Sequence, residues 1–246
     1  MLHLSDITLV VLAGNHIAPS EAAIGDVLKK FSFDDIIIFA DQFILPPPGG
    51  RVVVTPFSSV EDATRIAWRE IFPRLKTSHI LSMHWDGYPV RPEYWNDDFR
   101  QYDFIGAVWP WFNERAVGNT GFSLQSKHLL ESIQSLAFRQ PEDVALCRHY
   151  RPQLEQEYGI KYAPVSIADR FSIEHGPPHL QALGFHGLWN MLYFMDDEAI
   201  RQRLGLLRES QWHNPQIDAL ASRAMIAGRR ELYRWVLEAK YKIEQK

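Results

Sequence analysis

The first third of the chain alternates short apolar runs with helical patterns, and this alternation limits the possible folds more than any other feature. β-Branched apolar runs occupy residues 7–12, 36–40, 51–55 and 79–83. Because each run is apolar on both faces, it predicts a strand that is buried on both sides. Between the first two runs, one helix face is predicted by the spacing of Ile24, Val27, Leu28 and Phe31. Together these patterns predict an α/β fold with a mainly parallel sheet flanked by helices.

The next segments continue this alternation. Local signals predict a helix from its N-cap Ser59 through Phe72, a strand over residues 104–109, a strand over 122–124 and a helix over 126–136. Beyond Gly187 the sequence becomes helical and polar, with helix-forming composition over residues 196–207 and 217–246. We therefore expect an α/β domain over residues 1–190 and a helical C-terminal extension over residues 191–246.

The last predicted helix is basic. It carries Arg229, Arg230, Arg234, Lys240 and Lys242. A solvated face is the simplest interpretation of these charges, and contact with a partner or a membrane surface is the alternative.

Charge and hydropathy exclude several functional classes. The chain has 26 Lys and Arg against 30 Asp and Glu, and it has no basic run long enough to bind nucleic acid. Its longest apolar stretch near the start, residues 7–13, is far shorter than the roughly 20 residues of a transmembrane helix, and no basic signal-peptide segment precedes it. The single cysteine, Cys147, is expected in the core and fits a reducing compartment. We therefore predict a cytoplasmic protein without a transmembrane segment.

Polar residues and a glycine follow the predicted strands at the point where each strand ends. Ligands of parallel sheets bind at this edge, because the carboxyl ends of the strands meet there. The residues expected to share this rim and to bind a nucleotide are Gly14, Asn15, Asp41, His84 and Asp86.

His84 and Asp86 are the first candidates for chemistry. Residues two apart at the end of a strand point the same way, so these two side chains can converge on one ligand. A carboxylate there can hold a divalent ion against phosphate oxygens. Asp86-Gly87 is also a common tight-turn pair, so a plain turn is the alternative interpretation.

Glu142 and Asp143 are the second candidates. Because they follow a proline, they are typical of a well-capped helix start whose dipole favours acids. The functional alternative is that one of them projects into a cleft as a general base.

Three later features also have two interpretations. The Gly-Asn-Thr-Gly segment at 118–121 is either a glycine turn or a loop whose backbone approaches a polar ligand closely. His186 stands between glycines, and a single histidine is more often a surface or core residue than a ligand. Trp109 belongs to an aromatic cluster over residues 85–122 and either packs in the core or stacks on a sugar ring.

The order of these motifs resembles the nucleotide-sugar glycosyltransferases of the GT-A fold. The series is a strand followed by HWD, then FIGAVW, GNTGFSL, PEDV and GFHG, and it covers residues 7–187. It is most similar to a poorly characterised glycosyltransferase-like domain family with the patterns D-[YF]-I-G-A-x-W, G-N-x-G-F-S-L and E-D-V. The resemblance implies a Rossmann-like GT-A domain.

The resemblance also implies roles for individual residues. Asp86 matches the last acid of the DxD motif, which binds the metal and the diphosphate, while His84 replaces the first acid. His186 matches a late histidine that completes the metal site, and the implied ion is Mn²⁺ or Mg²⁺. Asp143 matches the catalytic base of similar inverting enzymes, and Glu142 would orient the acceptor or support the loop.

The remaining implied contacts concern the donor sugar and the acceptor. Asn119, Gly121 and Phe122 match the glycine loop beside them, and Trp109 would supply an aromatic wall. The implied function is an inverting, metal-assisted hexosyltransferase of the Leloir type in polysaccharide biosynthesis. It would move a sugar from a UDP-sugar donor to a glycan or another hydroxyl acceptor.

Two other functional classes remain open. The replacement of the first DxD acid by His84 is compatible with a degenerate module that binds a sugar or nucleotide without catalysis and acts through its helical tail. The same acids and histidines are also compatible with a metal-dependent hydrolase of phosphoesters or nucleotide sugars.

Overall fold

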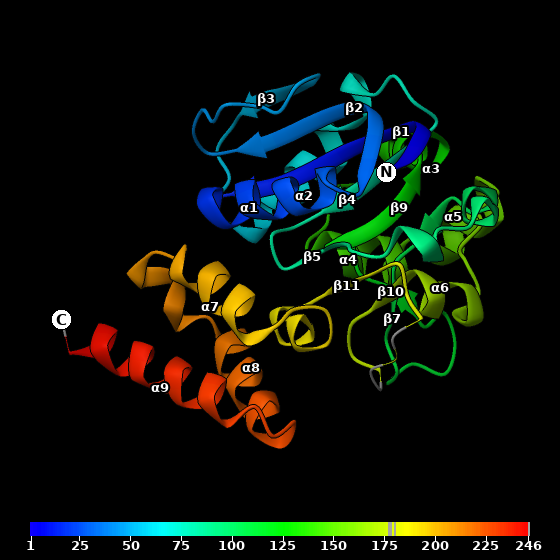
Figure 1. Cartoon of the computed structure of the whole chain (residues 1–246). Helices are drawn as coiled ribbons and strands as arrows, with labels where there is room; N and C mark the ends of the chain where they lie inside the picture. Colours follow the sequence, from blue (N-terminus) through cyan, green and yellow to red (C-terminus); the bar gives the residue numbers. More distant parts are fainter. Residues whose placement is uncertain (177–178, 180, 246) are drawn as a thin grey trace. The chain divides into compact units, whose positions relative to one another are not determined.

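The chain forms two compact units in a computed structural model that describes all residues except 177, 178, 180 and 246. The units are Met1–His186 and Gly187–Lys246, so the division falls after His186 rather than after residue 190. All strands of the described residues belong to the first unit, whereas the described part of the second unit is built of helices (Figure 1). The mixed α/β class and the helical C-terminal extension are therefore confirmed.

A six-stranded sheet forms the centre of the first unit. Its strand order is β3-β2-β1-β4-β9-β6. All neighbouring strands run parallel except at β9, which is antiparallel to both β4 and β6. The strands are β1 (Leu2–Gly14), β2 (Phe31–Ala40), β3 (Gly50–Val54), β4 (His79–Met83), β6 (Phe104–Ile105) and β9 (Phe122–Ser126). The predicted mainly parallel sheet is thus confirmed, and its central strand β1 is buried along most of its length.

Two helices of the first unit begin at serine caps, and the sequence predicts the first of these caps, Ser59. Ser59 caps α2 by accepting a hydrogen bond from the backbone N–H of Asp62, and Ser126 caps α3 in the same way from Leu129. The helix after Ser59 continues from α2 into a π-helix over Ile66–Glu70. The α-helices of this unit are α1 (Ile17–Leu28), α2 (Val60–Arg65), α3 (Lys127–Ser132), α4 (Glu142–Val144), α5 (Arg151–Glu157) and α6 (Val165–Phe171).

Two expected elements differ from the structure. Phe31 is not part of the predicted helix face, because α1 ends at Leu28 and Phe31 begins β2, where it pairs with Leu2. The strand predicted over residues 104–109 is divided at Gly106. Its first half, β6, joins the central sheet, whereas its second half, β7 (Ala107–Val108), pairs with β8 (Val117–Gly118).

A small second sheet carries one end of the candidate site. Its strand order is β10-β11-β5, formed by Ser172–Ile173, Gly184–His186 and Gly87–Pro89. β5 follows the turn after β4, and its pairing with β11 places His186 opposite Gly87. His186, the last residue of the first unit, is thereby brought to the carboxyl end of β4.

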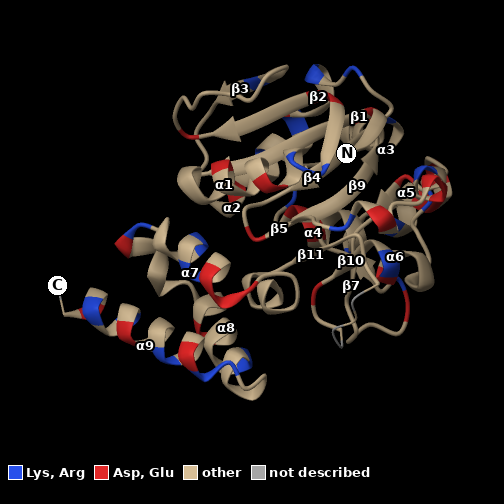
Figure 2. Cartoon of the chain, in the orientation of Figure 1, with Lys and Arg blue, Asp and Glu red and all other residues tan. Residues whose placement is uncertain are grey.

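The second unit is built of α7 (Asp197–Gly205), α8 (Pro215–Ile226), α9 (Arg230–Glu244) and short 3-10 turns. The helical stretch predicted over residues 217–246 is interrupted at Gly228, whose φ of 77° lies in the left-handed region. Basic and acidic residues both occur along α9 (Figure 2). Arg229, the residue before α9, forms an ion pair with Asp197 and donates to the carbonyl oxygen of Leu192. Its charge therefore stabilises contacts within the second unit. No helix in the described part of the chain has the length and apolar character of a membrane span.

The division at Gly106 provides a test of the fold. A Cβ at this position would overlap the backbone carbonyl oxygens of Gly118 and Asn119, neither of which can move as a side chain could. We expect Gly106→Ala to lower the free energy of unfolding by about 3 kcal/mol, as measured by urea denaturation. Gly25→Ala in helix α1 is the control, because a Cβ there meets no atom of the described residues within 4 Å. It should raise stability by about 0.5–1 kcal/mol, and equal midpoints for both variants would contradict the packing described here.

Candidate metal and substrate site

The turn after β4 brings His84 and Asp86 to the edge of the sheet. The backbone N–H of His84 donates to the carbonyl oxygen of Gly87 (2.9 Å), and the N–H of Gly87 donates back to His84 (3.2 Å). The segment is therefore the tight turn that its sequence allows. The same turn holds both candidate side chains, His84 at its first position and Asp86 at its third, so the structural and the functional interpretations are compatible.

Three side chains converge at this turn. One ligand atom from each of His84, Asp86 and His186 lies within 4.8 Å of the other two. The sequence placed Asp86 and His186 in a metal site and His84 among the nucleotide-binding residues, whereas the structure brings all three together. Atoms this close can hold one metal ion, and two imidazoles with one carboxylate are a familiar donor set for divalent transition metals.

A buried carboxylate orients His186. The Nδ1 atom of His186 lies 2.9 Å from Oε1 of Glu174, and the same oxygen accepts a hydrogen bond from Nδ2 of Asn119 (2.5 Å). Because an ionised carboxylate can only accept, the shared proton belongs to Nδ1 of the imidazole. A histidine that donates one ring N–H to a carboxylate is the arrangement that metal-binding histidines use.

Two glycines make room for this imidazole. A Cβ at Gly121 would overlap Nε2 of His186, and a Cβ at Gly87 would overlap its Cδ2 atom. Asn119, at a φ of 67°, fixes the loop by accepting a hydrogen bond from the N–H of Gly121 through Oδ1 (2.7 Å). The glycine loop of the sequence therefore shapes the space around His186.

His84 has the character of a neutral ligand. Burial lowers the pKa of its imidazole to about 4, helped by the charges of His186 and His16 and opposed by Asp86. Its Nε2 atom is buried and has no hydrogen-bond partner among the described residues. A buried nitrogen without a partner is costly unless a ligand satisfies it, so this observation fits a metal at the cluster.

The pKa of His186 is shifted in the opposite direction to that of His84. Burial opposes its positive charge, but the hydrogen bond to Glu174 and the charges of Asp86, Glu174 and Asp143 outweigh burial and raise its pKa. In Glu174, burial is likewise outweighed, by hydrogen bonds to His175 and His186, and its pKa falls to about 2. The two groups thus stabilise each other's charged forms.

The two acids at the start of α4 lie near the site, Glu142 against the glycine loop and Asp143 near His186. Burial and the charge of Asp143 raise the pKa of Glu142, whose carboxylate accepts hydrogen bonds from the hydroxyls of Thr120 (2.9 Å) and Thr64 (3.2 Å). Burial and the charge of Glu174 raise the pKa of Asp143, opposed by the backbone N–H of Val144 and by His186. Glu142 is therefore held by neighbouring hydroxyls, while Asp143 faces the charges of the cluster.

The predicted rim is present at the ends of β1 and β2. Gly14 pairs with Ala40, and its carbonyl oxygen accepts a hydrogen bond from the N–H of Asp41 (3.2 Å). Asn15 precedes His16, whose ring stacks on Trp85 of the turn after β4 at 5.5 Å. The ends of three parallel strands thus meet.

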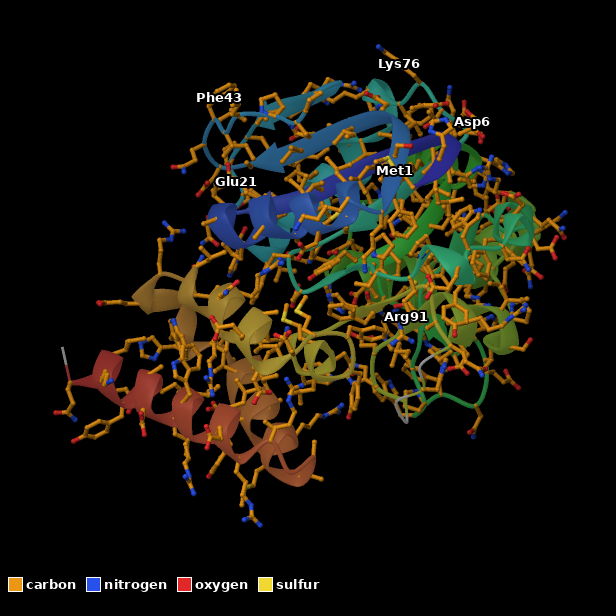
Figure 3. The ribbon with its side chains drawn as sticks, in the orientation of Figure 1. Met1, Asp6, Glu21, Phe43, Lys76 and Arg91 are labelled. Carbon is orange, nitrogen blue, oxygen red and sulfur yellow. The ribbon has the colours of Figure 1, made fainter. Side chains whose placement is uncertain are left out.

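The connection after β2 extends the rim outward. Asp41 is exposed, and Phe43 projects from this connection with 70% of its surface accessible (Figure 3).

Two predicted sugar-binding side chains lie in the core instead. Phe122 is fully buried and stacks on Phe171 with 4.7 Å between ring centroids. Trp109 is only 6% exposed, and its ring covers Gly118, where a Cβ would lie 2.5 Å away. Both rings support the glycine loop from the inside.

Sequence reasoning missed Glu174. It comes directly after β10, whose parallel neighbour β11 ends at His186. The rule that collects ligands at the carboxyl ends of parallel strands applies here too, but strands of two and three residues give no clear hydrophobic pattern.

Comparisons with known proteins give a family and distant structural likenesses. Residues 54–186, more than half of the chain, match the family described as "Protein of unknown function (DUF5672)". No curated protein matches the sequence.

Two solved structures are similar to the chain at low scores. A glycosyltransferase involved in the glycosylation of the major capsid of PBCV-1 is 16% identical, with a TM-score of 0.41, over 73% of this chain and 93% of that one. The protein A197 from STIV is 14% identical, with a TM-score of 0.36, over 66% and 80% of the two chains.

The orientation of His186 by Glu174 can be tested by pH titration. We expect Glu174→Gln to lower the pKa of His186, because the variant removes the negative charge that favours the imidazolium. NMR titration of the imidazole signals would measure this pKa. Glu155→Gln is the control, since Glu155 pairs with Arg151 and Arg115 instead. An unchanged His186 pKa in Glu174→Gln would show that the pair does not form.

Proposed function

This chain belongs to the DUF5672 family of unknown function, and we propose that it is a glycosyltransferase that uses a nucleotide-sugar donor, in the first place a UDP-sugar. The acceptor is a hydroxyl group of a glycan or another molecule. One observation carries the proposal: the cluster of His84, Asp86 and His186 lies beside Asp143 at the edge where the parallel strands end. The motif order of the sequence, which resembles GT-A enzymes, supports the same function.

The residues of the cluster fit a divalent metal ion. His84 offers a buried nitrogen that has no hydrogen-bond partner in the described part of the chain, and His186 contributes one ring nitrogen to the cluster. Asp86, which is 5% exposed, adds a carboxylate oxygen. When bound, a divalent ion neutralises negative charge on the diphosphate leaving group. Two nitrogen ligands favour Mn²⁺ over Mg²⁺, which prefers oxygen.

Asp143 is the proposed general base. The acceptor oxygen forms a bond to the anomeric carbon while its proton passes to the carboxylate of Asp143. The bond between that carbon and the diphosphate oxygen breaks, and its electron pair leaves with the nucleoside diphosphate. Attack on the face opposite the leaving group inverts the anomeric centre. The raised pKa of Asp143 strengthens it as a base.

Glu142 has a positioning role in this proposal. Its carboxylate joins Thr120 of the glycine loop to Thr64 of α2, so the start of α4 is fixed to the loop that surrounds His186. The base is thereby held at a constant place relative to the cluster, which is what an in-line transfer requires.

The other two functional classes differ from this proposal in their chemistry. A binding module without catalysis was motivated by the replacement of an acid at His84, but this imidazole converges with Asp86 and His186 as a third potential ligand. A hydrolase would use water in place of the acceptor hydroxyl. Transfer of the sugar to an added acceptor therefore separates the hydrolase from the transferase.

Nucleotide binding is the first test. We expect UDP, among UDP, GDP, CDP and dTDP, to raise the melting temperature only when Mn²⁺ is present. A ligand at a hundredfold excess over its Kd adds about 2.7 kcal/mol of stability. His186→Ala should abolish this shift, whereas His149→Ala, at an exposed position, should keep it. A shift that does not depend on Mn²⁺, or no shift with any nucleotide, would contradict the metal-assisted transferase.

Catalysis by Asp143 is a separate prediction. We expect Asp143→Asn to lower nucleoside diphosphate release from UDP-glucose, UDP-galactose and UDP-N-acetylglucosamine by about 100-fold or more, because the amide cannot accept the proton. The UDP-dependent melting shift should remain. Asp169→Asn, at an exposed position of α6, is the matched control. Equal release by Asp143→Asn and the parent chain would remove Asp143 from the mechanism.

A further inference from the structure

An exposed tryptophan stands on a rigid aromatic base in the segment after β7. Trp111 has 57% of its surface accessible, and its ring lies nearly parallel to that of buried Trp109, with 15° between planes and 6.3 Å between centroids. Phe112 packs against both rings, and the guanidinium of Arg148 lies 3.8 Å above the centre of the Phe112 ring. The exposed ring is thus fixed in place before any ligand binds.

This aromatic base is connected to the candidate site along two routes. The ring of His175 meets Trp111 edge-on at 4.7 Å, and its Nε2 atom lies 3.4 Å from the carboxylate of Glu174, which orients His186. On the other side, the ring of Trp109 covers Gly118, the residue before Asn119. Both routes therefore end at the side chains that hold His186.

We propose that Trp111 is the stacking platform for a sugar ring of the acceptor, so that the acceptor is a glycan. The inference rests on the proposed transferase and specifies its acceptor class. A sugar ring has an apolar C–H face and a rim of hydroxyls, and a largely exposed indole beside an imidazole matches both. The sequence assigned this role to Trp109, but Trp109 is covered and Trp111 carries the accessible surface.

Trp111 contacts the rings of Trp109, Phe112 and His175, but it remains mostly exposed. More than half of its surface faces solvent, so its removal costs little burial. Trp111→Ala should therefore melt close to the parent temperature, which separates a loss of binding from a loss of folding.

The experiment is a glycan array probed with the full-length chain. We expect the parent chain to bind a subset of glycans, Trp111→Ala to lose about tenfold or more of that affinity, and Trp111→Phe to retain most of it. Tyr241→Ala removes an exposed aromatic side chain of α9 and is the matched control. An unchanged glycan affinity in Trp111→Ala, or the absence of glycan binding by the parent chain, would overturn the proposal.

The outcome can be separated from that of the proposed function. A Mn²⁺-dependent UDP shift without glycan binding keeps the transferase and rejects the sugar platform. Glycan binding that depends on Trp111, without any nucleotide shift or donor cleavage, keeps the platform and rejects the transferase.

Discussion

The hydrogen bond between Glu174 and His186 is the contact on which the candidate site depends. It orients the His186 ring, which converges with His84 and Asp86, and it joins the second sheet to the glycine loop through Asn119. A buried carboxylate is costly unless charged or polar donors surround it. Here the two imidazoles and the amide supply them, so the groups that compensate Glu174 are also the ones that build the site.

Steric constraints also determine the position of the His186 ring. The imidazole of His186 occupies space that a side chain at Gly87 or Gly121 would fill, and Gly106 lets the backbone of the Asn119 loop approach the end of β6. These glycines act by close approach rather than by unusual dihedral angles, because none of the three has a positive φ. Small residues at these points are therefore a requirement of the site and not of turn formation.

The sequence predicted most of the sheet and named the three residues that converge after β4, because long apolar strands and motifs directly after them give strong signals. It missed Glu174, whose role depends on the pairing of strands only two and three residues long. It placed Phe31 on a helix because four apolar positions matched a helical period by coincidence. It also chose Trp109 over Trp111, since the pattern of aromatic residues does not reveal which ring of a stacked pair faces outward.

The site is assembled from segments far apart in the chain. His84 and Asp86 follow a central strand, whereas His186 is the last residue of the first unit. During synthesis the N-terminal part of a domain emerges first. The four parallel strands β1 to β4 are then available before the third member of the cluster exists. All six strands of the central sheet are therefore synthesised before His186, and a chain that stops short of β11 contains these strands but lacks the third member of the cluster.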